Sequence, residues 1–212
     1  MKKKYLYAVM TATMLSLGSC SGFLDTKPDT LLTQDQTFGD PTLVKSVLAN
    51  FYGRVTIGQR IDDWDQWTML DEVIHFDTNS DENVNRNKWR TYDYTLVHDL
   101  NQFLAGIKPS NAVDDATKTA YIGEVRYIRA WLYFCMGRTL GGVPIINDEI
   151  FNYTPGMDIT TLQIPRSTEA DLYDYVISEC QEAAKMLTKD TNKNSARANY
   201  WVAKMLEARA AL

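Results

Sequence analysis

Residues 124–146 of this 212-residue chain read EVRYIRAWLYFCMGRTLGGVPII and decide its fold. Apolar side chains recur here at spacings of three and four, which is the periodicity of a helix, and they occupy more than one side of it. A helix of that kind is packed between neighbours rather than lying on a surface. We therefore expect a central helix over about 116–139, with Ile128, Trp131 and Leu132 almost inaccessible to solvent.

Further helices are predicted on both sides of the central one from apolar stripes and capping residues. Asp40 before Pro41 offers an N-cap followed by proline at the first helical position. Thr168 and Asp171 have the spacing of a capping box. The predicted helices cover about residues 40–55, 92–107, 168–187 and 195–212.

The predicted fold class is all-α, with tetratricopeptide-like antiparallel helix pairs and long irregular loops. Ala130, four residues before Phe134, is the small-to-large pairing that lets a neighbouring helix approach. Strand alternation is not sustained anywhere, and residues 143–146 are at most a short extended piece. Residues 20–39 are polar and lack periodicity, so we expect them to form a tether that leads into a helical domain over 40–212.

The first twenty residues have the order of a secretory signal: three lysines, an apolar run over 5–17, two small residues and Cys20. The run is shorter than the about 20 residues that a transmembrane helix needs. Leu17-Gly18-Ser19-Cys20 resembles the lipobox of bacterial lipoproteins, which implies a signal peptide over 1–19 and an acylated Cys20 at the mature N-terminus. The alternative is an ordinary cleaved signal that a cysteine follows by chance.

Charge and composition exclude several classes of function. The chain has 22 basic and 27 acidic side chains, and the predicted signal peptide removes three lysines but no acid, so nucleic acid is an unsuitable partner. Only two histidines occur, with no Gly-x-Ser-x-Gly motif and no metal-ligand spacing, which argues against an enzyme and predicts no metal or cofactor. Cys135 and Cys180 lie on apolar stripes, which favours two buried free thiols over a disulfide.

One acidic stretch matches the start of a calcium-binding loop but not the rest of it. Asp77, Asn79 and Asp81 have the spacing that begins an EF-hand loop. Glu82 stands where that loop needs glycine, and Lys88 where it needs the bidentate glutamate. A solvated acidic turn is the better interpretation.

Three stretches in order resemble the SusD/RagB family of outer-membrane nutrient-binding lipoproteins of Bacteroidota. They are SCSGFLDTKP, EVRYIRAWLYFCMGRTLGGVPII and IPRSTEADLYDYVISECQEAAKML. YDYTLVHDLNQFL resembles the family's tyrosine-to-asparagine helix, with Asn101 at the matching position, and SARANYWVAKMLEARAAL resembles its following helix.

The resemblance implies a helical, non-enzymatic lipoprotein at the outer membrane. Such a protein captures oligosaccharides or other nutrients and delivers them to a SusC-like TonB-dependent transporter, on which it sits as a lid. The lipid anchor on Cys20 would hold it to the membrane, facing the cell surface. Only Asp25 represents the acid-rich signal that often follows the cysteine of surface-exposed lipoproteins. The sequence therefore does not decide between the inner and the outer leaflet of the outer membrane.

An aromatic and acidic region before the second helix has the composition of a sugar-binding surface. Aromatic faces stack on the apolar side of a pyranose, and carboxylates and amides bind its hydroxyls. For Trp67 and Trp89, packing beneath the loop is an equal alternative. The candidate ligand-binding residues are Trp64, Trp67, Asp77, Asn79, Trp89 and Tyr92.

A second hypothesis is a helical interaction module that binds the transporter without a ligand site of its own.

The last predicted helix has an apolar stripe too broad for one neighbour and ends at Leu212 without a cap. We therefore expect the chain to be the N-terminal part of a longer protein, with exposed apolar side chains around Trp201 and Met205.

Overall fold

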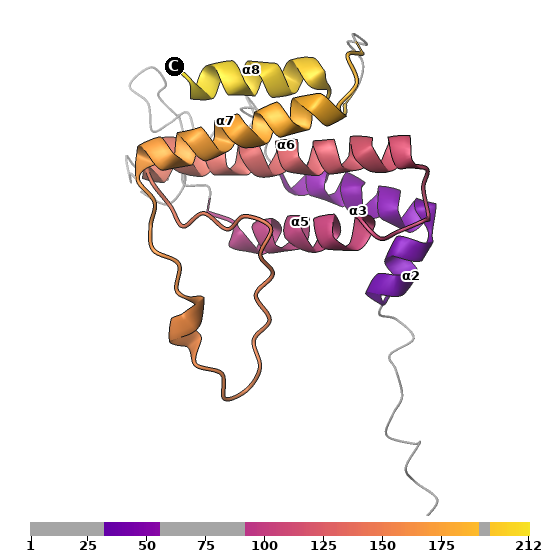
Figure 1. Ribbon diagram of the computed structural model, residues 1–212, viewed down its shortest axis with the longest axis horizontal. Helices are drawn as coiled ribbons and strands as arrows, with labels where there is room; N and C mark the ends of the chain where they lie inside the picture. Colours follow the sequence, from indigo (N-terminus) through magenta and orange to yellow (C-terminus); the bar gives the residue numbers. More distant parts are fainter. Residues whose placement is uncertain (1–31, 56–91, 191–195) are drawn as a thin grey trace, which may run out of the picture. The chain divides into compact units, whose positions relative to one another are not determined.

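The computed structural model describes residues 32–55, 92–190 and 196–212, and in this part of the chain all regular structure is helical. The chain divides into two units, residues 1–36 and 37–212. Figure 1 shows the helices of the second unit in sequence colours. In chain order the elements are α2 (Gln34–Gly39), α3 (Pro41–Arg54), α5 (Tyr94–Ile107), α6 (Asp115–Leu140), the 3₁₀ helix η1 (Ile159–Leu162), α7 (Glu169–Met186) and α8 (Tyr200–Ala210).

Side-chain caps set where the helices begin. The Asp40 carboxylate accepts from the backbone N–H of Thr42 at 2.7 Å, which starts α3 as the sequence predicts. The Thr168 hydroxyl accepts from the Asp171 N–H at 3.1 Å and starts α7. Each cap satisfies an N–H that has no partner within its own helix. Asp93, Asp114 and Asn199 cap α5, α6 and α8 in the same way.

Consecutive long helices pack in antiparallel pairs, the tetratricopeptide-like arrangement that the sequence predicts. Close contacts run from Gly123, early in α6, to Met186 at the end of α7, and from Gly137, late in α6, to Leu172 at the start of α7. The Tyr200 N–H donates to the Thr188 carbonyl at 2.9 Å and closes the hairpin from α7 to α8. Figure 1 shows α6, α7 and α8 side by side in that order.

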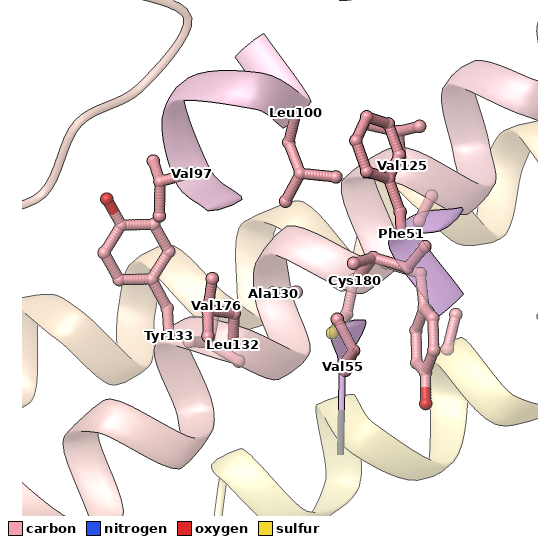
Figure 2. Close-up of a cluster of buried hydrophobic side chains, with 14 of the residues drawn as sticks. Phe51, Val55, Val97, Leu100, Val125, Ala130, Leu132, Tyr133, Val176 and Cys180 are labelled. Atoms are coloured by element: carbon pink, nitrogen blue, oxygen red, sulfur yellow. The ribbon is translucent and has the colours of Figure 1, made fainter. Parts of the chain in front are cut away.

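Helix α6 is the centre of the core. Ile128 is 0% and Leu132 3% exposed, which confirms the prediction for both. Figure 2 shows Leu132 in a cluster of buried side chains that come from α3, α5, α6 and α7. The prediction is wrong for Trp131, which is only partly buried because it lines a hollow bordered by α3, α5 and α6.

The structure contains one helix that the sequence analysis did not predict and one that begins later than predicted. Helix α2 lies within residues 20–39, which were expected to be an irregular tether. A reciprocal capping pair starts it: the Gln36 side chain accepts from the Thr33 N–H at 2.9 Å, and the Thr33 hydroxyl accepts from the Gln36 N–H at 3.3 Å. Helix α8 begins at Tyr200, later than the predicted 195, because Asn199 is its N-cap.

Two further observations concern the membrane and the thiols. Within the described ranges, no helix is both long enough and apolar enough to cross a membrane. Cys135 and Cys180 are buried free thiols, as predicted. Burial raises the pKa of Cys180 to about 12, with Glu207 and Glu179 adding to the rise, so this thiol stays protonated at neutral pH.

Candidate ligand-binding surface

Tyr92 is the one sequence-predicted ligand residue that lies within the described ranges. Its side chain is 64% exposed, just before α5. Its ring lies edge-on to that of Tyr94, with 4.9 Å between the centroids. Cys20, Trp64, Trp67, Asp77, Asn79 and Trp89 lie outside the described residues.

A small hollow lies beside the start of α5. Asp93 and Leu96 line it from α5, Arg54 from α3 and Trp131 from α6. Arg54 forms an ion pair with Asp99 at 2.5 Å, across α3 and α5. The cavity volume is about 70 Å³, which is well below the volume of a pocket that encloses a small molecule. The hollow can therefore receive one edge of a ligand, with an indole, a carboxylate and a guanidinium at its border.

The loop over residues 141–168 starts by running along α5 and α6. The Tyr94 hydroxyl donates to the Pro144 carbonyl at 2.5 Å. The Tyr133 hydroxyl accepts from the Ile146 N–H at 2.8 Å and contacts the Ile146 carbonyl at 3.2 Å. Residues 144–149 have no helix or strand to pair their backbone, so these side chains supply its partners.

Arg129 supplies further partners from the interior of the protein. Its side chain is fully buried, and Nη1 donates to the Asn147 carbonyl and to the Asp148 carboxylate, each at 2.9 Å. Nη1 also donates to Asn101 Oδ1 at 2.7 Å, and Asn101 Nδ2 donates to the Glu149 carbonyl at 2.9 Å. The guanidinium therefore joins α5 and α6 to the loop.

The other edge of the same guanidinium binds α7. Arg129 Nη2 and Nε donate to Glu179 Oε2 at 2.7 and 3.1 Å, and Arg126 binds Glu179 Oε1 at 2.7 Å. Glu179 is only 4% exposed, so its charge is balanced by buried hydrogen bonds to two arginines. We refer to Asn101, Arg129, Asp148 and Glu179 as the Arg129 cluster.

Charges within the Arg129 cluster shift the pKa of its members. Burial by itself would lower the pKa of Arg129, but Tyr175 and Glu179 raise it above the ordinary value. Burial would likewise raise the pKa of Asp148, yet the hydrogen bond and charge of Arg129 lower it below the ordinary value. Both groups are therefore charged at neutral pH.

A second buried carboxylate ties α3 to the segment that precedes α8. Glu124 is 3% exposed and binds Arg197 Nη2 at 2.5 Å and Arg197 Nε at 2.9 Å. The Tyr52 hydroxyl donates to Glu124 at 2.7 Å and accepts from the Ala198 N–H at 2.9 Å. This cluster stabilises the packing of the helices, with Glu124 buried and the Arg197 side chain 42% exposed.

The far part of the loop extends beyond the helices (Figure 1). Its exposed apolar side chains are Tyr153, Met157 and Ile159, which are 66%, 38% and 59% exposed. The returning end is held at Arg166, whose guanidinium donates to the Leu140 and Gly142 carbonyls.

The Arg129 cluster was not predicted, although the sequence contains a signal for it. Arginines 126 and 129 fall within the helix predicted to lie at the centre of the core, where an unpaired charge would be costly. Their presence implies buried carboxylates on neighbouring elements. The identity of those carboxylates, Glu179 and Asp148, could not be read from the sequence.

Comparisons with known proteins agree on one family. A SusD-like family model, described as starch-binding and associating with the outer membrane, matches residues 22–212. A SusD-like protein of Bacteroides ovatus is 26% identical over 99% of this chain and 39% of its own length. The chain therefore spans about two fifths of this relative.

Solved structures show the same fold. A SusD-like protein of Bacteroides fragilis aligns with a TM-score of 0.63 at 24% identity, over 87% of this chain and 37% of its own. A SusD-like carbohydrate-binding protein of the same species aligns with a TM-score of 0.58 at 18% identity, over 82% of this chain and 37% of its own.

Proposed function

The chain belongs to the SusD-like family of outer-membrane-associated binding proteins, which are not enzymes, and we propose that it captures oligosaccharides at the cell surface for a SusC-like TonB-dependent transporter. The observation that carries this proposal is the family match over residues 22–212. One structural relative is named as carbohydrate-binding, which supports a glycan as the ligand class.

The surface around Tyr92 is the part of the described structure best suited to a sugar. An exposed tyrosine ring can stack on the apolar face of a pyranose at little cost in side-chain entropy. The nearby hollow offers Asp93 and Arg54 for hydroxyl groups and the Trp131 indole for further stacking. Trp64, Trp67, Asp77, Asn79 and Trp89 belong to the same proposal on their sequence pattern alone.

A binding panel tests the ligand class. The full chain is titrated by calorimetry with maltoheptaose, laminarihexaose and a peptide mixture, and saturable binding of an oligosaccharide without cleavage products supports the proposal. Tyr92→Ala should weaken that binding about two- to tenfold, the range expected for loss of one stacking contact. Tyr153→Ala is the matched control, because Tyr153 is equally exposed at 66% but lies in the far part of the loop. Failure of every oligosaccharide would contradict the proposal.

The proposed membrane anchor is acylated Cys20, with residues 1–19 removed and the residues between Cys20 and α2 as the tether. Several acyl chains on one residue hold a protein stably to a bilayer. Cys20→Ala should therefore release the folded protein from the outer-membrane fraction into the soluble fraction. A variant that still needs detergent for extraction would argue against lipidation.

Exposed apolar side chains on α8 favour a second candidate, a module that binds the transporter without its own ligand. Trp201 is 52% and Met205 56% exposed, as the sequence predicts. Exposed aromatic and methionine side chains are typical of protein interfaces. Loss of co-purification with the transporter in Trp201→Ala, in a protein that binds no glycan on the panel, would favour this candidate.

A further inference from the structure

We propose that Arg129 is a positioning residue that holds residues 144–149 against α5 and α6 and thereby sets the position of the Tyr92–Tyr94 pair. The effect on ligand binding rests on the proposed function, whereas the effect on the loop does not.

The backbone of residues 144–149 depends on side chains for its hydrogen bonds. Four of its carbonyls, those of Pro144, Ile146, Asn147 and Glu149, contact side-chain donors of α5 and α6. Arg129 binds one of these carbonyls directly and a second through Asn101. Residues 144–146 are partly buried and 147–149 are exposed, so without these donors the carbonyls bind water and the segment is no longer held in this position.

The hydrogen bonds that position 129 makes to residues 144–149 require the Arg129 guanidinium, whereas the packing of α6 against α7 does not. An apolar side chain at position 129 could fill the space between α6 and α7, as replacements of buried ion pairs show. It could not donate to α5, α7 and the loop at once. The planar fork of arginine does so through five contacts. Nη1 shares its two N–H groups among Asn101, Asn147 and Asp148, and Nη2 and Nε donate to Glu179.

One hydrogen bond connects residues 144–149 to the candidate surface around Tyr92. The Tyr94 hydroxyl donates to the Pro144 carbonyl, and the Tyr94 ring is the edge-on neighbour of Tyr92. Tyr94 is therefore bonded at its hydroxyl to the segment that Arg129 holds. A displaced segment removes that bond and lets both rings move.

Hydrogen exchange of the full chain tests the proposal. Arg129→Met with Glu179→Gln removes both charges of this pair together, and the amide oxygen at position 179 still accepts from Arg126. Arg129→Lys is the second variant: it keeps a cation opposite Glu179 but loses the fork. In each, exchange of the Ile146 N–H, which donates to the Tyr133 hydroxyl, should become about tenfold faster, because Arg129 no longer holds the segment at Asn147 and Asp148. Exchange in α7 should stay within about twofold of the unsubstituted protein, because its apolar packing is retained.

Tyr175→Phe is the matched control. The Tyr175 ring lies 5.2 Å from that of Tyr133, but its buried hydroxyl has no hydrogen-bond partner among the described residues. This variant should leave the exchange of residues 144–149 unchanged.

The outcomes separate the two proposals. Faster exchange in residues 144–149 with protected α7 supports the positioning role. Unchanged exchange there, or an equal loss of protection in α6 and α7, overturns it. In titrations with maltoheptaose and laminarihexaose, the Arg129 variants should weaken binding as Tyr92→Ala does, and Tyr175→Phe should not. If the unsubstituted protein binds neither, the proposed function fails while the exchange result still decides the role of Arg129.

Discussion

Gly142→Ala tests how closely the two ends of the loop approach each other. A methyl carbon on Gly142 would lie 1.9 Å from the Ser167 carbonyl oxygen and 2.8 Å from the Ser167 carbonyl carbon. Both are backbone atoms, so no side-chain rotation relieves the contact, and the two ends must separate by about 1 Å.

That separation breaks the hydrogen bonds that join the loop ends. The Ser167 N–H donates to the Val143 carbonyl and the Val143 N–H to Ser167 Oγ, each at 3.2 Å, and Arg166 donates to the Gly142 carbonyl. At about 1 kcal/mol for each bond, the loss is about 3 kcal/mol. For a domain of this size, the Tm should fall by about 6–12 °C.

Thermal unfolding followed by circular dichroism measures this effect, with Gly53→Ala as the control. Gly53 lies in α3, and a methyl group there would meet nothing within 4 Å. The control should gain about 1 kcal/mol, because alanine is the better helix former. A Gly142→Ala protein with the Tm of the unsubstituted chain would refute the reasoning.

Two further predictions concern the core and the loop. Leu132→Ala should lower the free energy of unfolding by about 2–5 kcal/mol in urea titrations, since Leu132 is 3% exposed at the centre of the core; a loss below this range would mean that the helices collapse into the cavity. Asp148 has a lowered pKa, so its contribution to stability is complete above the usual value of 3.8 and is lost as the pH falls through the lower value in the folded state. The difference in urea midpoint between the unsubstituted protein and Asp148→Asn should therefore be constant near neutral pH and shrink below about pH 4; a difference that persists in acid would show that the carboxylate charge is not responsible.

Helices whose signals are local in the chain were predictable from sequence. Within each apolar stripe of α3, α5, α6 and α7, successive residues are only three or four positions apart. At Asp40 and Thr168, the capping side chain and the N–H that it accepts from are also only a few positions apart. The short helix α2 was missed because part of its stabilisation comes from a distant segment. Phe38 packs edge-on against Phe103, with 5.6 Å between the centroids, and the Ser110 hydroxyl donates to the Phe38 carbonyl at 2.6 Å.

The candidate surface was predictable only in part, because it also depends on residues that are distant in the chain. Composition identified Tyr92 as an exposed aromatic, because its neighbours in the chain are polar. The partial exposure of Trp131 could not be predicted, since periodicity shows that a helix is buried on several sides but not which neighbours leave a hollow.

The long helices, the caps at Asp40 and Thr168 and the class of core follow from the sequence, because periodicity and capping act between residues close in the chain. Only the tertiary structure decided how residues 144–149 are held. Their carbonyls bind Tyr94, Asn101 and Arg129, which are 18 to 50 residues away. A segment without regular structure of its own takes its position from donors that folding brings to it, and no local pattern records which donors those will be.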